Sequence, residues 1–422
     1  MTELTRQDVL KRRLAIQMLQ SERFSSAADV VRLLGCVQSQ EYAHALWSLG
    51  MRTSGLGAAE VQAEFDRGDF LRTHILRPTW HFVAAEDIRW ILEVTAPRVQ
   101  KLNQTIYRKE GLDPATLDRG VALIVEELKG GRYRTRAELG QALADQHLVS
   151  GFRAARASRS ESAAVVVARR GNDTSAHSSS VRRRAISDAR SSGLGLAYIV
   201  MNAELEGVIC SGTMRGAQQT YALLDERVPR STAADALRAS ASRAPPHGEA
   251  RCASSAKEGD AAELARRFFA GHGPASIQDL ARWSSLTISQ CRDAVDAVKD
   301  RLDCVTVDGL ELWFGPDPPP ARQSSGALLL PLYDELTLSY PVINFPQAPG
   351  HPHTPGEDLF IGSVIIAETN VGTWRRTVQG RKMIMEIALA PGVARRSGAL
   401  VEAAASKLAT FLGKELELTI TG

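Results

Sequence analysis

Residues 276–314 read SIQDLARWSSLTISQCRDAVDAVKDRLDCVTVDGLELWF, and this stretch decides the fold. Ser276, with Asp279 three residues later, is typical of a capping box that opens a short helix. After a brief turn, Thr287 has the residue type that caps a second, longer helix, which we expect to end near Val298. The stretch therefore begins with two helices joined by a tight turn.

The second half of the same stretch predicts a β-hairpin. Two short strand-like runs, 304–307 and 310–314, flank Asp308-Gly309, the strongest short signal for a two-residue hairpin turn. A further helix is expected just upstream, over 258–269. Helix, short helix, turn, longer helix and hairpin together predict a winged helix-turn-helix unit. The alternative is an unrelated three-helix unit with an adventitious hairpin.

The same order of elements recurs twice earlier in the chain, which favours a tandem array around a shared concave face. The expected fold class is α+β, mainly α: three tandem winged-helix units around a concave DNA-binding face, plus a small β-rich C-terminal domain. The expected divisions are a first winged helix over 1–97, a second over 98–230, a flexible linker over 231–257, a third winged helix over 258–325 and an α+β domain over 326–422.

One segment interrupts the second unit. Residues 151–192 are rich in Arg and Ser and have neither a helical nor a strand period. We interpret this segment as an irregular insertion. A DNA-binding tail is the alternative, although no aromatic residues alternate with the arginines in its core.

Composition limits the class of protein. The 422 residues are 44% hydrophobic and 23% charged, with a net charge of +3, so a nucleic-acid surface must be a local basic face. The five cysteines are scattered singly, which predicts buried thiols in a reducing compartment and neither a disulfide framework nor a zinc site. The polar N-terminus and the absence of a long apolar run predict a cytoplasmic protein without a membrane span.

The first unit carries an unusual pair of amides. Gln38 and Gln40 flank Ser39 in a segment between two expected helices. Two glutamines in a polar loop are usually solvated, but residues 76–83, LRPTWHFV, follow where the wing of the same unit is expected. The pair is therefore a candidate site only because other motifs accompany it in the sequence.

Those motifs lie further along the chain, as AELEGVICSG at 203–212, YALLDER at 221–227, LPLYDE at 330–335 and VGTWRRT at 371–377. The ordered set resembles the AlkZ-like family of winged-helix DNA glycosylases, over most of the chain apart from the two irregular segments. The resemblance implies excision of alkylated bases from DNA, including those in interstrand crosslinks. It assigns catalysis to Gln38 and Gln40, with Ser39 standing where the family prefers an aliphatic residue.

Two amides make chemical sense for a cationic substrate. Glutamine is a poor base, but an N7-alkylated purine is already positively charged and is a good leaving group. The protein then needs mainly to orient a water and to present carbonyl dipoles to the cationic sugar. No lysine nucleophile, metal or organic cofactor is implied, so the expected reaction is monofunctional hydrolysis of the N-glycosidic bond.

Further candidates lie beside this motif. His81 follows Trp80 on an expected strand, where it supports the active loop or contacts a phosphate; a structural role is the alternative. Arg77, before Pro78, is a candidate phosphate contact from its position alone.

The C-terminal domain adds two pairs of charged residues. Arg375 and Arg376 follow Trp374 on an expected hairpin, so one of the two should face DNA if the hairpin does, because successive strand residues point to opposite faces. Asp334 and Glu335 are adjacent acids, for which a cap or turn role is favoured over a water-activating pair.

The expected partner is double-stranded DNA with alkylated or crosslinked bases, with no membrane and no obligatory protein partner. A non-catalytic winged-helix DNA-binding protein or transcriptional regulator is the alternative function. Tandem winged helices alone support both functions. A regulator prefers a sequence and a repair enzyme prefers damage, so lesion dependence separates them.

Overall fold

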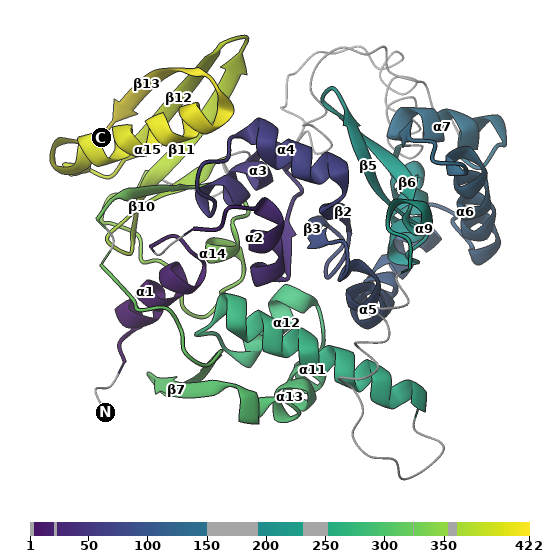
Figure 1. Cartoon of the computed structure of the whole chain (residues 1–422), viewed down its shortest axis with the longest axis horizontal. Helices are drawn as coiled ribbons and strands as arrows, with labels where there is room; N and C mark the ends of the chain where they lie inside the picture. The colour runs from purple at the N-terminus through teal and green to yellow at the C-terminus, as the bar shows by residue number, and fades with distance from the viewer. Residues whose placement is uncertain (1–3, 21–22, 150–192, 231–251, 324, 353–360) are drawn as a thin grey trace, which may run out of the picture.

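The computed structural model of the chain describes residues 4–20, 23–149, 193–230, 252–323, 325–352 and 361–422 (Figure 1). The expected insertion over 151–192 lies outside these residues, as does most of the expected linker. The prediction of a flexible linker is wrong for its described end, because residues 252–257 form the start of helix α11 (Cys252–His272). Their two alanines and their Lys are good helix formers, so this helix begins earlier than the apolar pattern indicates.

The N-terminal part contains a small antiparallel sheet surrounded by helices. The helices are α1 (Arg6–Ile16), α2 (Ala27–Leu34), α3 (Tyr42–Met51), α4 (Ala58–Arg67) and α5 (Ile88–Lys109), and the strands are β1 (Cys36–Gln38), β2 (Phe70–His74) and β3 (Trp80–Ala84). The strand order is β1-β3-β2, with β3 in the centre. Every residue of β2 is buried, so this sheet lies inside the molecule rather than at its edge.

Helix α5 joins the first part to the second. It runs without interruption through residues 97 and 98, where the sequence predicted a division between two units. Pro97 lies inside this helix, although proline usually ends or kinks a helix because it removes a hydrogen bond. The two parts therefore share one continuous element.

The second part has its own apolar core. Its elements are α6 (Pro114–Leu128), β4 (Arg134–Thr135), α7 (Arg136–Asp145), a helix over 193–205, β5 (Ile209–Arg215), β6 (Gln218–Leu223) and α9 (Leu224–Arg227). The strands are ordered β4-β6-β5, and β5 lies next to β2 of the first sheet. At this junction the backbone N–H of Arg72 donates to the Ser211 hydroxyl at 2.8 Å.

The third part follows the predicted order of elements. After α11 come α12 (Ile277–Ser284), α13 (Ile288–Asp296), a 3₁₀ turn (Lys299–Arg301), β7 (Asp303–Val307) and β8 (Leu310–Phe314). The capping box of Ser276 and Asp279 is formed as expected, and Thr287 caps α13. Asp308 and Gly309 have φ values of +50° and +77°, the left-handed conformation that a tight hairpin turn requires.

The C-terminal domain is a five-stranded sheet with one long helix, and Figure 1 shows this helix lying against the sheet. Its elements are β9 (Ala327–Leu330), α14 (Glu335–Leu338), β10 (Gly362–Ile366), β11 (Thr369–Gln379), β12 (Lys382–Leu389), α15 (Val393–Leu412) and β13 (Glu415–Thr421). The order is β13-β12-β11-β10-β9, antiparallel except for the β12–β13 pair. The short helix α14 leaves this sheet and lies against β1, which brings the domain to the candidate motif.

The chain thus has the mixed helical and sheet architecture expected from its sequence. In the described part of the chain, no helix is both long and apolar enough to cross a membrane. Cys36, Cys210 and Cys291 are buried free thiols as expected, whereas Cys304 is exposed because it lies on the outer hairpin strand β7.

Candidate active site and DNA interface

The Gln-Ser-Gln motif lies where β1 ends. Gln38 is the last residue of β1 and is paired with His81 of β3. The Ser39 N–H donates to the carbonyl oxygen of Trp80 at 2.8 Å, so the extended backbone continues one residue beyond the strand. Gln40 lies in a bend two residues after Gln38. Gln38 is 8% exposed and Gln40 is half-buried.

The hydrogen bonds around the Gln38 side chain can each run in one direction only, because of the donors and acceptors involved. One Nη atom of Arg77 lies 2.9 Å from Gln38 Oε1 and 3.0 Å from His81 Nε2. A guanidinium can only donate, so both partners must accept. His81 Nδ1 must then carry the proton, and it donates to the Thr79 carbonyl at 2.9 Å.

His81 is consequently a neutral, internal histidine. Its side chain is fully buried, and burial, followed by the charge of Arg77, lowers the pKa of His81 well below its ordinary value. Both ring nitrogens are engaged within the protein. Of the two roles predicted for His81, this geometry fits support of the active loop and not contact with a phosphate.

The backbone of Gln38 is held from the C-terminal domain. Its N–H donates to Glu335 Oε1 at 2.8 Å, and the other carboxylate oxygen accepts from the Ser339 hydroxyl at 2.6 Å. Glu335 is fully buried, and burial raises its pKa while the charge of Arg77 opposes that rise. Glu335 thus holds the Gln38 backbone in place through a buried hydrogen bond.

The neighbouring acid, Asp334, has a structural role. It caps α14 by accepting from the Leu336 N–H at 3.0 Å, and it forms a fully buried ion pair with Arg52 at 2.9 Å. Burial alone would raise the pKa of Asp334, but Arg52 and the hydrogen bonds hold it below its ordinary value. The cap role expected for this position is confirmed by these contacts.

A second arginine holds the backbone of the motif. Arg72 of β2 donates to the Ser39 carbonyl at 2.8 and 3.0 Å and to the Gln40 carbonyl at 3.2 Å. Its guanidinium lies 4.4 Å from the ring centre of Trp80 and also contacts the Gln219 side chain. Burial lowers the pKa of Arg72 to about 10, so this cation is held in the interior by its acceptors.

The second part of the chain closes the site from the side. Glu204, on the helix over 193–205, is fully buried and accepts from the Trp80 indole N–H at 3.2 Å. Its other oxygen contacts His74 Nδ1, and the His74 ring lies 4.5 Å from that of Trp80. A residue more than a hundred positions away therefore fixes the aromatic residue beside the motif.

Sequence reasoning missed four of these supporting residues as members of the site, namely Arg72, His74, Glu204 and Glu335. A signal was present for two of them, because FLRTHIL at 70–76 places an Arg and a His inside an otherwise apolar strand. Buried polar groups of this kind require specific partners. The partners themselves come from distant segments and carry no such local signal.

Ser39 is the departure from the pattern of the resembling family, and it is fully buried. Within the part of the chain that the structure describes, its hydroxyl oxygen has no hydrogen-bond partner. A small polar side chain thus occupies an internal position without using its polarity.

The two arginines of β11 point in different directions, as the alternation of a strand predicts. Arg375 is exposed and pairs with Glu386 on β12. Arg376 donates to the Ala43 carbonyl at 3.3 Å, and burial lowers its pKa. Arg375 is therefore the one of the pair available on the surface.

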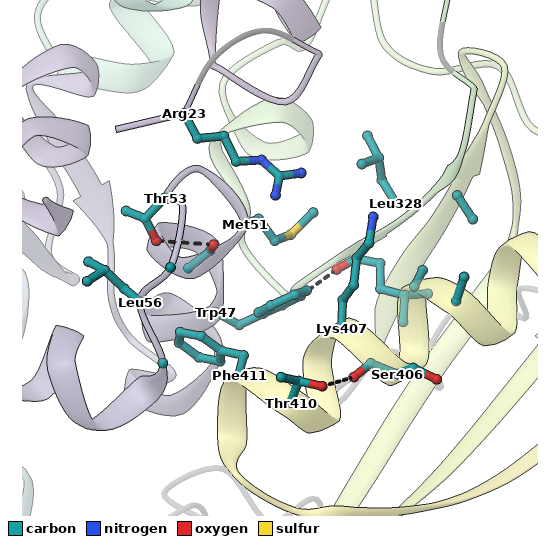
Figure 2. A pocket seen from close by; sticks show the side chains of 17 residues that line it. Arg23, Trp47, Met51, Thr53, Leu56, Leu328, Ser406, Lys407, Thr410 and Phe411 are labelled. Carbon is teal, nitrogen blue, oxygen red and sulfur yellow. Dashed lines mark hydrogen bonds between the residues drawn. The ribbon is translucent and has the colours of Figure 1, made fainter. Parts of the chain in front are cut away.

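A separate cavity of about 500 Å³ lies between α3, β9 and α15 (Figure 2). Arg23 and Lys407 extend over a mainly apolar lining that includes Trp47, Met51 and Phe411. Neither glutamine of the motif lines this cavity. Among the described residues there is also no group of three or more His, Cys, Asp or Glu that could hold a metal ion.

Comparisons with known proteins address the chain as a whole. The family model described as DNA glycosylase AlkZ-like matches residues 31–411. The solved structure of the Streptomyces sahachiroi DNA glycosylase AlkZ is similar, with a TM-score of 0.68 and 18% identity over 100% of both chains. No curated protein sequence matches. The family match spans nearly the whole chain, including the motif, and the chain belongs to the AlkZ-like family and is a DNA glycosylase.

Proposed function

We propose that this DNA glycosylase hydrolyses the N-glycosidic bond of cationic N7-alkylated purines, with Gln38 and Gln40 as its catalytic residues. The observation that carries the proposal is the arrangement at the end of β1. Gln38, the last residue of β1, and Gln40, two residues later, belong to a segment whose backbone is held by Arg72 and Glu335, while Arg77 holds the Gln38 amide. A segment fixed in this manner is preorganised to orient a water.

The reaction needs no strong base. The bond between C1′ and N9 breaks with its electron pair moving to the purine, which neutralises the positive charge of the alkylated ring. Water adds to C1′ and releases a proton to solvent, leaving an abasic site. Amide carbonyl oxygens stabilise the cationic sugar by their dipoles, so neutral lesions should be poor substrates.

The two glutamines differ in how firmly their side chains are held, which fits different roles in orienting the water. Gln38 is held at both its backbone and its amide oxygen. Gln40 is half-buried, and among the described residues its amide oxygen makes one contact, at 3.4 Å from the Trp80 N–H. We infer that Gln40 turns to meet the water, because this weak contact costs little to break.

For DNA binding we propose three winged-helix units around a shared concave face. The helix and hairpin order of residues 252–314 supports this interpretation most directly. An open face suits bulky or crosslinked lesions, which cannot easily be flipped into a small pocket. The proposal therefore extends to the unhooking of interstrand crosslinks.

Among the residues expected to contact DNA, Arg375 is the proposed phosphate contact, because its side chain is 69% exposed although it also pairs with Glu386. Arg77, His81 and Arg376 are all less exposed than Arg375. The transcriptional regulator considered from the sequence has no feature in its favour beyond the helices themselves.

The test is release of 7-methylguanine from alkylated duplex DNA. We expect release by the wild type and its loss in Gln38→Ala and in Gln40→Ala, with DNA binding retained. Gln141→Ala removes an exposed glutamine on α7 and serves as the matched control, with release unchanged. A folded wild type that binds DNA but releases base from neither alkylated nor crosslinked duplex would overturn the proposal.

A further inference from the structure

Arg77 comes from the connection between β2 and β3, and its side chain turns back into the protein instead of extending outward. A single Nη atom meets two acceptors, Gln38 Oε1 and His81 Nε2. The side chain is only partly accessible, and burial lowers the pKa of Arg77 from its ordinary value. These are features of an internal tether.

The tether determines which end of the Gln38 amide faces inward. An amide has an accepting oxygen and a donating nitrogen that occupy nearly the same space, so its orientation depends on its partners. Arg77 offers only donors, and the amide nitrogen cannot accept, so the oxygen must face Arg77. The oxygen keeps one lone pair for another partner.

His81 cannot set this orientation by itself. Its Nδ1 proton is committed to the Thr79 carbonyl, which leaves Nε2 as an acceptor. An acceptor there would attract the amide nitrogen of Gln38 if Arg77 were absent. Arg77 lies between the two groups and reverses that preference.

We propose that Arg77 is a positioning residue for the proposed reaction, on which this inference rests: it fixes the orientation of the Gln38 amide and does not hold a DNA phosphate. The charged groups facing Arg77 are consistent with this role. The charges that act on Arg77 most strongly are those of the Glu335 carboxylate and of Arg282, from α12. Glu335 also holds the Gln38 backbone, so one buried carboxylate both opposes the charge of Arg77 and fixes the residue that Arg77 orients.

The kinetic test compares Arg77→Ala and Arg77→Lys with Arg282→Ala. The last removes an exposed positive charge close to Arg77 without touching Gln38. We expect the single-turnover rate of 7-methylguanine release to fall about 10–100-fold in Arg77→Ala, as for other small misplacements of a reacting group. The DNA concentration at half-saturation should change less than about twofold.

Arg77→Lys should fold like the wild type but recover only part of the rate, because an ammonium lacks the planar fork of a guanidinium. A phosphate contact predicts the opposite pattern. It would raise the half-saturation concentration, leave the rate intact and lower the slope of binding against salt by about 1. That pattern in Arg77→Ala would overturn the inference.

A second measurement is independent of catalysis. In protein labelled with ¹⁵N-histidine, the His81 ring signals, assigned by their loss in His81→Gln, should report an Nδ1-protonated neutral ring. Arg77→Ala should raise the pKa of His81, because a nearby positive charge is removed. An unchanged pKa of His81 in Arg77→Ala would overturn the inference even if activity fell. The same titration tests the inference if the wild type releases no base.

Discussion

The β2–β3 ladder and the β7–β8 ladder are antiparallel pairs of five-residue strands, yet only β2–β3 buries polar side chains as well as apolar ones. In β7–β8 the buried side chains are Val307, Leu312 and Phe314, and the charged residues are exposed. In β2–β3 almost every side chain is buried, including Arg72, Thr73, His74 and His81. One ladder is stabilised by ordinary alternation, and the other encloses polar groups.

Enclosed polar groups are stable only when they are hydrogen-bonded, since each unsatisfied one costs about 1–3 kcal/mol. In β2–β3 the partners lie outside the two strands: Ser39 and Gln40 for Arg72, Glu204 for His74, and Arg77 of the connecting loop for His81. The Thr73 hydroxyl is an exception within the described residues. The difference indicates that β7–β8 has a structural role, whereas β2–β3 positions the side chains of the candidate site.

The largest effect is expected from Arg72→Ala. The change removes a buried cation, leaves the Ser39 and Gln40 carbonyls without their donor and opens a cavity beneath Trp80. We expect a loss of about 3 kcal/mol or more in the free energy of unfolding, measured with urea.

Arg67→Ala is the matched control for Arg72. Arg67 lies at the end of α4 with its side chain 59% exposed and paired to Asp69. We expect a change below about 1 kcal/mol there. Equal losses in the two variants would contradict the distinction between enclosed and ordinary polar residues.

Acid should weaken the β2–β3 ladder through His81. Its pKa is lowered in the folded protein, so the unfolded chain binds a proton more readily as pH falls below about 6.5. Stability from this group is complete above that pH and is lost progressively on acidification. The histidines His44 and His272, each with a pKa lowered mainly by burial to about 4, act in the same direction.

The contribution of His81 can be isolated by difference. Unfolding free energies of the wild type and His81→Gln, measured at pH 7.5, 6.5 and 5, should run parallel above pH 6.5 and converge below it. Curves that stay parallel down to pH 5 would show that His81 does not titrate in this way. The β7–β8 ladder contains no histidine and offers no such sensitivity.

The same comparison explains what the sequence could and could not predict. The capping box of Ser276 and the Asp308-Gly309 turn are local signals, and the structure forms both as expected. The sequence placed Gln38 in a segment between two helices, whereas the structure shows that this segment begins as β1 and pairs Gln38 with His81. The contacts that complete the site join Gln38 to Glu335 and Trp80 to Glu204, and no local pattern encodes such distant pairs.

Helix α5 shows a second limit of local patterns. The sequence-based division fell between residues 97 and 98, but tertiary packing of α5 against α11 keeps one helix of 22 residues. Packing overrides the weak local preference in this case.

A smaller and opposite effect is expected from Ser39→Ala. The hydroxyl is buried without a partner in the described structure, so its removal should raise the free energy of unfolding by about 1 kcal/mol. Release of 7-methylguanine should persist, because the Ser39 backbone that binds Arg72 is unchanged. A loss of stability on urea unfolding would instead mean that the hydroxyl is satisfied in solution.

The smallest effect belongs to the outer ladder. Arg6 pairs with Asp308 at the β7–β8 turn, but the two side chains are 59% and 56% exposed. Water and salt screen such a pair, so Arg6→Ala should change the free energy of unfolding by less than about 1 kcal/mol, and by less still at high salt.

Gly309→Ala tests the same turn by its backbone instead of its charge. Gly309 has a φ of +77°, which an L-residue adopts at a cost of about 1 kcal/mol, independent of salt. Salt should therefore separate the two variants, reducing the effect of Arg6→Ala and leaving that of Gly309→Ala unchanged. If Arg6→Ala proved as costly as Arg72→Ala, the outer ladder would depend on its polar contacts as strongly as the inner one, and the contrast between scaffold and site would fail.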